Sequence, residues 1–245
     1  IHDWAFGLTR RDRSPKPAFA VVRDVYHVAP YFPLPRVPKV SVVVASYNAD
    51  RTLKACLESL RRLNYPDYEI ILVDDGSTDR TPQLAEQFRR GEEPPPVKTG
   101  DGSPDNGSAV APGSAHQLVT SAVSGNFRYF RHTTNLGLSV ARNSGIAAAE
   151  GEIVAFTDAD CRTDEDWLYY LVADLLDSEF AGMGGPNLLP PEDSVVAAAV
   201  MVSPGGPAHV MLDDRQAEHI PGCNMAFYKS ALAAIGGFDN RKSVV

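Results

Sequence analysis

The sequence predicts an α/β fold with a mainly parallel central sheet and helices on both faces of that sheet. Three apolar, β-branched runs of strand length predict buried strands at Val40–Ala45, Glu69–Val73 and Ile153–Thr157. Helical patterns separate these runs, and such alternation is typical of a parallel sheet. Polar residues follow each run, and ligands of parallel sheets bind beyond the carboxyl ends of the strands. We therefore expect a binding site at that edge.

The composition is that of an ordinary globular domain. The chain has 245 residues, of which 44% are hydrophobic and 22% charged, so it can bury one sizeable core. The 23 basic and 31 acidic residues give a net charge of −8. This balance argues against a nucleic-acid partner, because clustered Lys and Arg would supply that affinity. No run reaches the roughly 20 apolar residues of a membrane span, and we do not expect Ile1–Trp4 to begin a signal peptide.

Helices are expected between the strands. Asp50 and Thr52 can start the first, and apolar residues follow them at helical spacing. Thr81-Pro82 predicts the start of a second helix, since proline is favoured at the first helical position. A third helix is expected over Leu138–Ala149. Thr163 and Asp166 have the spacing of a capping box and predict a fourth helix.

Two segments differ from the rest of the chain. Residues 1–38 are rich in proline, which predicts a linker or the remnant of a preceding domain, with one helical pattern around Ala18–Tyr26. Residues 91–125 are rich in Gly, Ser, Pro and Asp and lack periodicity, which predicts a disordered surface insertion. The main domain is therefore expected to span residues 39–245 around this insertion.

The three cysteines, Cys56, Cys161 and Cys223, lie far apart in the sequence and form no C-x-x-C pair. They fit a reducing compartment, and we interpret them as small hydrophobic residues rather than disulfide partners.

The second strand ends in Asp74-Asp75-Gly76-Ser77. One interpretation is a plain turn, because Asp, Gly and Ser form turns readily. A turn does not require two adjacent carboxylates, however, and these repel each other near a low-dielectric crevice. The other interpretation is that an outward-pointing carboxylate accepts the imide N–H of uracil.

The third strand ends in Asp158-Ala159-Asp160. Two oxygen donors one residue apart suit a hard divalent cation such as Mg²⁺ or Mn²⁺, which takes its remaining ligands from phosphate and water. Such an ion also neutralises the charge that grows on a departing diphosphate. An acidic turn is the alternative.

Two further segments carry candidate residues. Arg142, in the third predicted helix, is interpreted either as a solvated surface charge or as a contact to phosphate or ribose. Gly222 and Asn224 lie at the polar start of an apolar strand predicted within Pro221–Phe227.

Taken together, the segments Val40–Asn48, Val73–Asp79 and Phe156–Asp160 resemble the inverting family-2 glycosyltransferases in order and spacing. The resemblance covers roughly residues 39–240. It implies the Rossmann-like GT-A fold, a nucleoside-diphosphate sugar donor (usually a UDP-sugar), a carbohydrate acceptor and Mg²⁺ or Mn²⁺.

The resemblance also implies roles for individual residues. Ala45, Tyr47 and Asp75 would border the uracil, and Asp158 would approach the ribose. The acidic motif corresponds to the family's DxD motif, in which Asp160 would bind the metal. Gly222 and Asn224 would begin the acceptor side.

Two departures accompany the resemblance. Family members carry an acidic pair, including the general base, shortly after a stretch like Gly236–Asp239. Here residues 240–245 contain no carboxylate, so the base is expected beyond Val245. Phe6–Thr9 and Arg11–Ala18 resemble the closing segment of a TIM-barrel glycoside hydrolase. Both observations suggest a longer parent protein, expected in the cytoplasm or at the cytoplasmic face of the membrane through downstream segments.

The sequence leaves one alternative function open, a nucleotide-sugar-binding module that lacks the general base and does not catalyse transfer. A sugar-phosphate nucleotidyltransferase fits less well, because the loop at Ala45–Asp50 is not Gly-rich and has no basic residue.

Overall fold

The computed structural model describes residues 14–28, 33–92, 126–189, 194–201, 210–211 and 216–239. Most of the predicted insertion and the first part of the hydrolase-like segment lie outside these ranges. The chain divides into two compact units, Ile1–Val37 and Pro38–Val245. The first unit contains one described helix, α1, at Pro17–Val28, which includes the predicted helical pattern.

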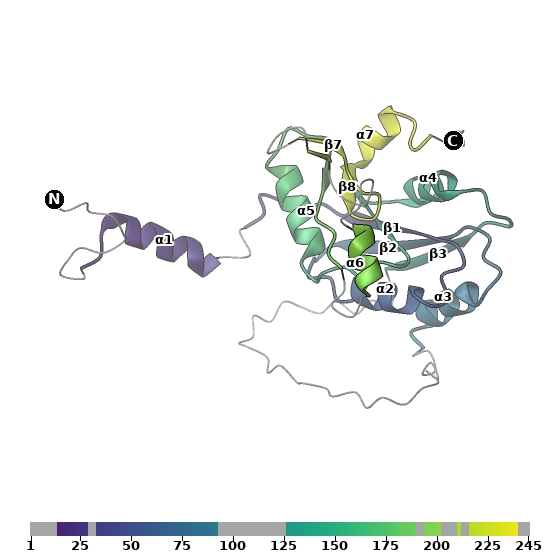
Figure 1. Ribbon diagram of the computed structural model, residues 1–245. Helices are drawn as coiled ribbons and strands as arrows, with labels where there is room; N and C mark the ends of the chain where they lie inside the picture. The colour runs from purple at the N-terminus through teal and green to yellow at the C-terminus, as the bar shows by residue number, and fades with distance from the viewer. Residues whose placement is uncertain are drawn as a thin grey trace, which may run out of the picture. The chain divides into compact units, whose positions relative to one another are not determined.

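The second unit alternates strands with helices (Figure 1). Its elements are β1 (Val40–Ser46), α2 (Leu53–Leu60), β2 (Tyr68–Asp74), α3 (Thr81–Arg90), β3 (Phe127–Arg131), α4 (Leu138–Ala148), β4 (Ile153–Asp158), α5 (Trp167–Leu176), β5 (Gly182–Gly184), α6 (Val195–Met201), β6 (Val210–Met211), β7 (Ala217–His219), β8 (Met225–Tyr228) and α7 (Lys229–Ala234).

One sheet of six strands has the order β3-β2-β1-β4-β8-β5. The first four of these strands run parallel, and β8 pairs antiparallel with both β4 and β5. Strands β6 and β7 form a separate antiparallel pair. The predicted α/β class and mainly parallel sheet are confirmed.

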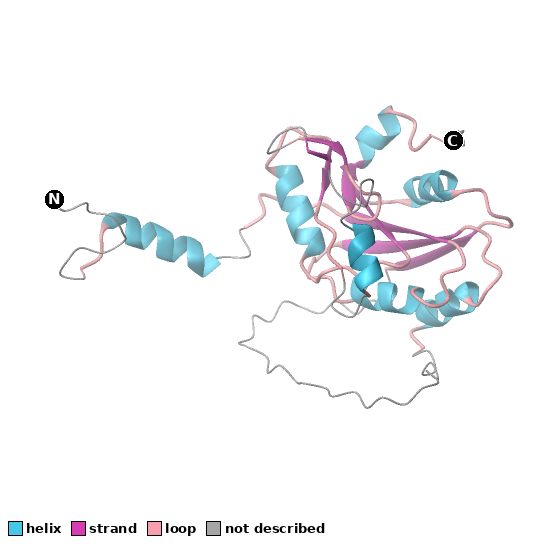
Figure 2. Ribbon diagram, viewed as in Figure 1, coloured by secondary structure: helices cyan, strands magenta, loops and turns pink. Residues whose placement is uncertain are grey.

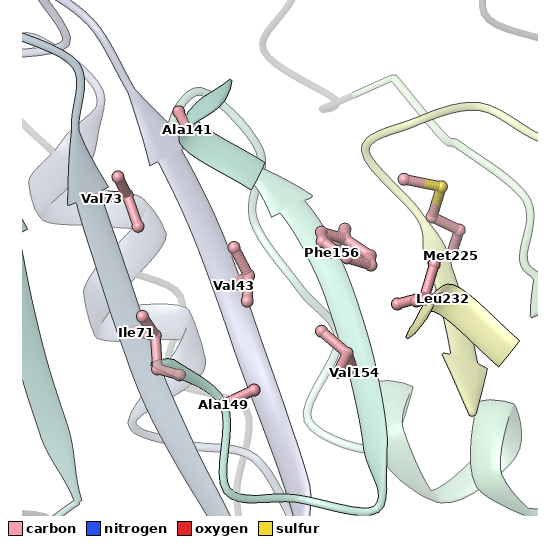
Figure 3. Close-up of a cluster of buried hydrophobic side chains, with 9 residues drawn as sticks. All are labelled: Val43, Ile71, Val73, Ala141, Ala149, Val154, Phe156, Met225 and Leu232. Carbon is pink, nitrogen blue, oxygen red and sulfur yellow. The ribbon is translucent and has the colours of Figure 1, made fainter. Parts of the chain in front are cut away.

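Helices cover both faces of this sheet (Figures 1 and 2). Alternate side chains of β1, β2 and β4 pack against α4 and α7 in a cluster of buried hydrophobic residues that includes Val43, Val73 and Phe156 (Figure 3). On the other face lie α2 and α3, and α2 buries Leu53, Leu57 and Leu60. The burial of apolar surface on each face holds the layers together, and it stabilises the fold by about 25 cal/mol per Å² buried.

The predicted capping box is wrong. Helix α5 begins at Trp167 with Asp166 as its N-cap residue, and no side chain caps it. Thr163 instead donates from its backbone N–H to Ser59 Oγ of α2 at 3.0 Å, which ties the β4–α5 loop to the neighbouring helix. The spacing of Thr163 and Asp166 is compatible with a capping box, but Thr163 contacts Ser59 of α2 and does not cap α5.

Among the described residues, none of the helices combines the length and apolarity needed to cross a bilayer.

Candidate functional site

The strand register brings two predicted residues side by side. Ala45 of β1 pairs with Asp158 of β4 on one side and with Val73 of β2 on the other. Side chains alternate along a strand, so these three lie on the face that α4 covers. Ala45 packs against the hydrophobic cluster of that face. The carboxyl edge of the sheet therefore has an apolar floor with a carboxylate next to it.

Arg142 of α4 reaches the same place. Its Nη2 atom donates to Asp158 Oδ1 at 3.2 Å and to the Gly222 carbonyl oxygen at 3.0 Å. The guanidinium also lies over the Phe238 ring, 5.3 Å from its centroid. Only 11% of the arginine side chain is exposed. The interpretation of Arg142 as a solvated surface charge is therefore wrong, while contact with a nucleotide stays a prediction.

Asp158 is a partly buried carboxylate, with 35% of its side chain exposed. Burial raises its pKa and so does the nearby Asp160, while the Arg142 guanidinium lowers it, and the net pKa lies above the usual value. A cationic or hydrogen-bonding neighbour therefore stabilises the ionised form of this partly buried carboxylate.

The adjacent acidic residues Asp74 and Asp75 have different roles. Asp74 is fully buried and accepts hydrogen bonds from the Ser77 backbone N–H and the Tyr129 hydroxyl, each at 2.9 Å. Arg131 Nε lies 3.4 Å from the same carboxylate. Asp74 therefore builds the turn, as the plain-turn interpretation predicted for this motif.

Asp75 does not point outward, which corrects the expectation for its carboxylate. It is buried, and its Oδ1 lies 2.7 Å from His132 Nδ1 and accepts from the Leu136 N–H at 2.9 Å. Its Oδ2 accepts from the Gly137 N–H at 2.8 Å. The carboxylate is thus held at the start of α4, where the helix dipole also favours a negative charge. Contact with uracil stays a prediction for this residue.

These contacts set the acidity of Asp75. Burial by itself raises its pKa, but the hydrogen bonds from His132 and from the backbone N–H groups of Leu136 and Gly137 outweigh burial. The pKa therefore lies below the usual value, and the group is ionised at neutral pH.

The loops after β1 and β2 are joined by side-chain hydrogen bonds. Ser77 Oγ accepts from the Asn48 N–H at 2.8 Å, and Asn48 Oδ1 accepts from the Thr78 N–H at 2.9 Å. Asn48 has a positive φ of 50°, which asparagine tolerates better than most residues. Asp79 Oδ2 accepts from the Asp50 N–H at 3.0 Å. These bonds fix the loop that carries Tyr47, a residue that is 51% exposed.

Asp160 is exposed, at the turn just after β4. The Cys161 Sγ lies 3.7 Å from its Oδ1. Within the described ranges no group of three or more His, Cys, Asp or Glu side chains could hold a metal ion. Asp160 and Asp158 are nonetheless oxygen donors, and Mg²⁺ commonly uses only one or two carboxylates together with substrate phosphates. The residues present fit that kind of site.

The two residues predicted for the acceptor side have structural contacts. The Gly222 carbonyl receives the Arg142 hydrogen bond described above. Asn224 accepts from Trp167 Nε1 at 2.7 Å and donates to the Pro186 carbonyl at 2.8 Å. Asn224 is buried and joins α5, β8 and the segment after β5. Contact of either residue with an acceptor stays a prediction.

Two cysteines meet next to this site, which the sequence interpretation did not expect. Interaction with the Cys161 thiol lowers the pKa of Cys223 to about 7, and the same interaction raises the pKa of Cys161. Cys56 fits the interpretation as a small buried hydrophobic residue, and burial raises its pKa to about 12. All three are free thiols.

Two site residues had no recognisable sequence signal. His132 joins Asp75 to Ser144 of α4, since its Nε2 lies 2.9 Å from the Ser144 hydroxyl. Asn143 donates to the Phe238 carbonyl and accepts from the Phe238 N–H, both at 2.8 Å. A single polar residue on a helix, such as Asn143, or after a strand, such as His132, carries no periodicity that distinguishes these contacts from solvent exposure.

The mainly parallel sheet with its acidic motifs at one carboxyl edge has the architecture of the GT-A fold of glycosyltransferases. Residues 41–99 and 97–236 match Glycosyl transferase family 2, and the chain belongs to that family.

Three known proteins illustrate the similarity. The poly-beta-1,6-N-acetyl-D-glucosamine synthase of Staphylococcus epidermidis is 27% identical over 139 residues, which cover 57% of this chain and 26% of that protein. Mannosyltransferase PcManGT from Pyrobaculum calidifontis, in complex with GDP-Man and Mn²⁺, has 20% identity and a TM-score of 0.55 over 92% of this chain and 55% of that one. S. aureus TarS 1-349 in complex with UDP has 20% identity and a TM-score of 0.51, covering 84% and 52%.

At 20% identity, the two solved structures show that this chain shares their fold. The chain spans 27% and 26% of the lengths of two further curated relatives, so the activity of the whole protein is a matter for proposal.

Proposed function

We propose that this chain binds a UDP-sugar, with UDP-glucose as the first donor to test. The sugar passes to a carbohydrate hydroxyl with inversion at the anomeric carbon, in polysaccharide synthesis. The observation that carries this proposal is the register of Ala45 with Asp158, which sets an apolar floor beside a carboxylate at the carboxyl edge of the sheet. The synthase relative and the UDP-bound neighbour support the substrate class.

In this proposal each part of the nucleotide meets a different group. The exposed Tyr47 ring and Ala45 border the uracil, and Asp75 behind them accepts its imide N–H. Asp158, held by Arg142, faces the ribose. Because Asp75 already accepts three hydrogen bonds, only one of its roughly four lone-pair positions is free for the base.

A divalent cation, Mg²⁺ or Mn²⁺, would bind Asp160 with Asp158 nearby. When bound, it would neutralise charge on the departing diphosphate. The Mn²⁺ in the mannosyltransferase neighbour supports a metal of this kind. The acceptor oxygen attacks the anomeric carbon from the side opposite the diphosphate.

A cytoplasmic location stays a prediction.

Calorimetry with UDP, with and without Mn²⁺, tests the donor site. UDP should bind in the presence of Mn²⁺, and GDP should compete poorly. Equal competition by GDP would contradict uracil recognition, and UDP affinity that does not depend on Mn²⁺ would contradict the metal. The neighbour that holds GDP-Man makes this comparison informative.

A measurement of turnover distinguishes an active glycosyltransferase from a non-catalytic nucleotide-sugar-binding module. Release of UDP from UDP-glucose, measured with and without glucan acceptors, should rise when an acceptor is present. Tight UDP binding without release in either condition would favour the alternative of a non-catalytic nucleotide-sugar-binding chain, because general-base catalysis typically contributes 10²–10⁴-fold in rate.

A further inference from the structure

His132 follows β3 and lies between the Asp75 carboxylate and helix α4. Its Nδ1 atom is 2.7 Å from Asp75 Oδ1, and its Nε2 atom is 2.9 Å from the Ser144 hydroxyl of α4. The histidine side chain is 15% exposed. Both ring nitrogens are therefore engaged inside the protein, and the orientation of the ring is held from two sides.

The charge of Asp75 determines the direction of these hydrogen bonds. An ionised carboxylate can only accept, so His132 Nδ1 carries the hydrogen and donates it to Asp75. In the neutral ring, Nε2 then accepts from the Ser144 hydroxyl. Each group donates to the next, from Ser144 through His132 to Asp75, and hydrogen bonds in such a chain strengthen one another.

The contacts of Asp75 differ between its two oxygens. Among the described residues, Oδ1 accepts from His132 and from the Leu136 N–H, whereas Oδ2 accepts from the Gly137 N–H. Each carboxylate oxygen has about two lone-pair positions. His132 thus completes the pair on Oδ1 and leaves the remaining position on Oδ2, where the imide N–H of uracil can bind.

Helix α4 connects this carboxylate to the second carboxylate of the site. Ser144 holds Asp75 through His132, and Arg142 of the same helix donates to Asp158 Oδ1 at 3.2 Å. The proposed function places uracil at Asp75 and ribose at Asp158. The helix therefore sets the spacing between the groups that meet two parts of one nucleoside.

We propose that His132 is a positioning residue for base recognition, which holds Asp75 so that its free oxygen position accepts the N3–H of uracil and repels cytosine. This role rests on the proposed function, because it presupposes that the base meets Asp75. Cytosine has a lone pair in place of the N3–H, so an anionic acceptor at that point disfavours it. His132 would therefore contribute to the preference for UDP over CDP by acting through Asp75.

The acidity of Asp75 supports this role. Burial by itself raises its pKa, and the hydrogen bond from His132 is the largest of the contacts that lower it. Without that donor the carboxyl group would bind a proton more readily, and a protonated Asp75 can donate to N3 of cytosine. Loss of the His132 donor should therefore weaken binding of UDP but not of CDP.

Two amide variants separate the two contacts of His132. The amide nitrogen of asparagine is as many bonds from Cβ as histidine Nδ1, and that of glutamine is as many as Nε2. His132→Asn therefore keeps a donor for Asp75, whereas His132→Gln keeps a partner for Ser144 and loses that donor. Because each variant loses one hydrogen bond, urea denaturation should show similar losses of stability.

Calorimetry with Mn²⁺ present measures UDP binding, and competition by CDP measures base selectivity. We expect His132→Gln to lower UDP affinity about tenfold and to leave CDP affinity unchanged, so the preference for UDP falls by the same factor. His132→Asn should keep both affinities within about threefold of wild type. Ser144→Ala, which also keeps the donor to Asp75, is the matched control and should behave like His132→Asn.

Equal losses of UDP affinity in the asparagine and glutamine variants, or no loss in either, would overturn this role of His132. Parallel losses of UDP and CDP affinity would overturn it too, because they indicate a loosened site without base selectivity. Circular dichroism checks that each variant folds. If His132→Gln does not fold, a loss of the UDP preference in His132→Asn and Ser144→Ala overturns the role, and a retained preference supports it. A wild-type chain that binds no UDP would instead reject the proposed function and, with it, the role of His132.

Discussion

Arg142 Nη2 contacts Asp158 at 3.2 Å and the Gly222 carbonyl at 3.0 Å, so one nitrogen of α4 joins the end of β4 to the turn before β8. Asp158 and Gly222 had been expected on the donor and acceptor sides of the same site. The arginine fixes the distance between these two sides before any ligand binds. Pre-organisation of this kind reduces the ordering that binding would otherwise require.

Replacing Arg142 should destabilise the fold. Arg142→Met leaves the partly buried Asp158 without its cation, and the loss should lie between the ~0–1 kcal/mol of exposed ion pairs and the ~3–5 kcal/mol of broken buried pairs, at about 1–3 kcal/mol. Urea denaturation measures the loss. Arg51→Ala, an exposed arginine, is the control and should change stability by less than about 0.5 kcal/mol. Equal effects of the two changes would mean that the Arg142 contacts contribute nothing.

Gly222→Ala should act through the same arginine. A Cβ at this position would lie 2.6 Å from Arg142 Nη2, so the guanidinium would have to leave its place between Asp158 and the Gly222 carbonyl. The alanine change should destabilise the wild type but have little further effect in the Arg142→Met background. A double-mutant cycle by urea denaturation measures this coupling. Additive losses would show that the alanine acts through something other than Arg142.

The stability of the chain should depend on Asp75 in acid. Its folded-state pKa lies below the usual value, so its stabilising contribution is present above the unfolded pKa of about 3.9 and is lost as the pH falls through the folded pKa. Asp75→Asn should therefore be less stable than wild type at neutral pH, and the difference should shrink below about pH 3. Unfolding curves at several pH values test this. A difference that does not vary with pH would assign the effect to shape rather than charge.

Asp160→Ala should remove most Mn²⁺-dependent UDP binding and leave the fold intact, because the carboxylate is exposed and outside the core. Calorimetry measures binding, and the melting temperature reports on the fold. Asp67→Ala is the matched control, since Asp67 is an exposed carboxylate just before β2, at the opposite edge of the sheet. A similar loss of UDP affinity in both variants would point to general electrostatics instead of a metal ligand.

The sequence by itself determined the strands β1, β2 and β4, most of the helices and the edge at which the site lies. Strand and helix periodicities are local properties, so Val40–Ala45, Glu69–Val73 and Ile153–Thr157 could be recognised without knowing their neighbours. The alternation of strands with helices predicted a parallel sheet, and so placed the polar residues that follow the strands at its carboxyl edge, where Asp158 and Asp160 are found.

Only the tertiary structure decided what most of those side chains contact. Asp75 turns toward His132 and the start of α4, Arg142 is buried against Asp158, and Cys161 meets Cys223. Each of these contacts joins residues separated by one or more elements and depends on strand order, on the antiparallel return of β8 and on which helix covers which face. Local propensity carries no information about such long-range packing, because the same polar residue on a helix or turn can face solvent or a buried partner with the same sequence pattern.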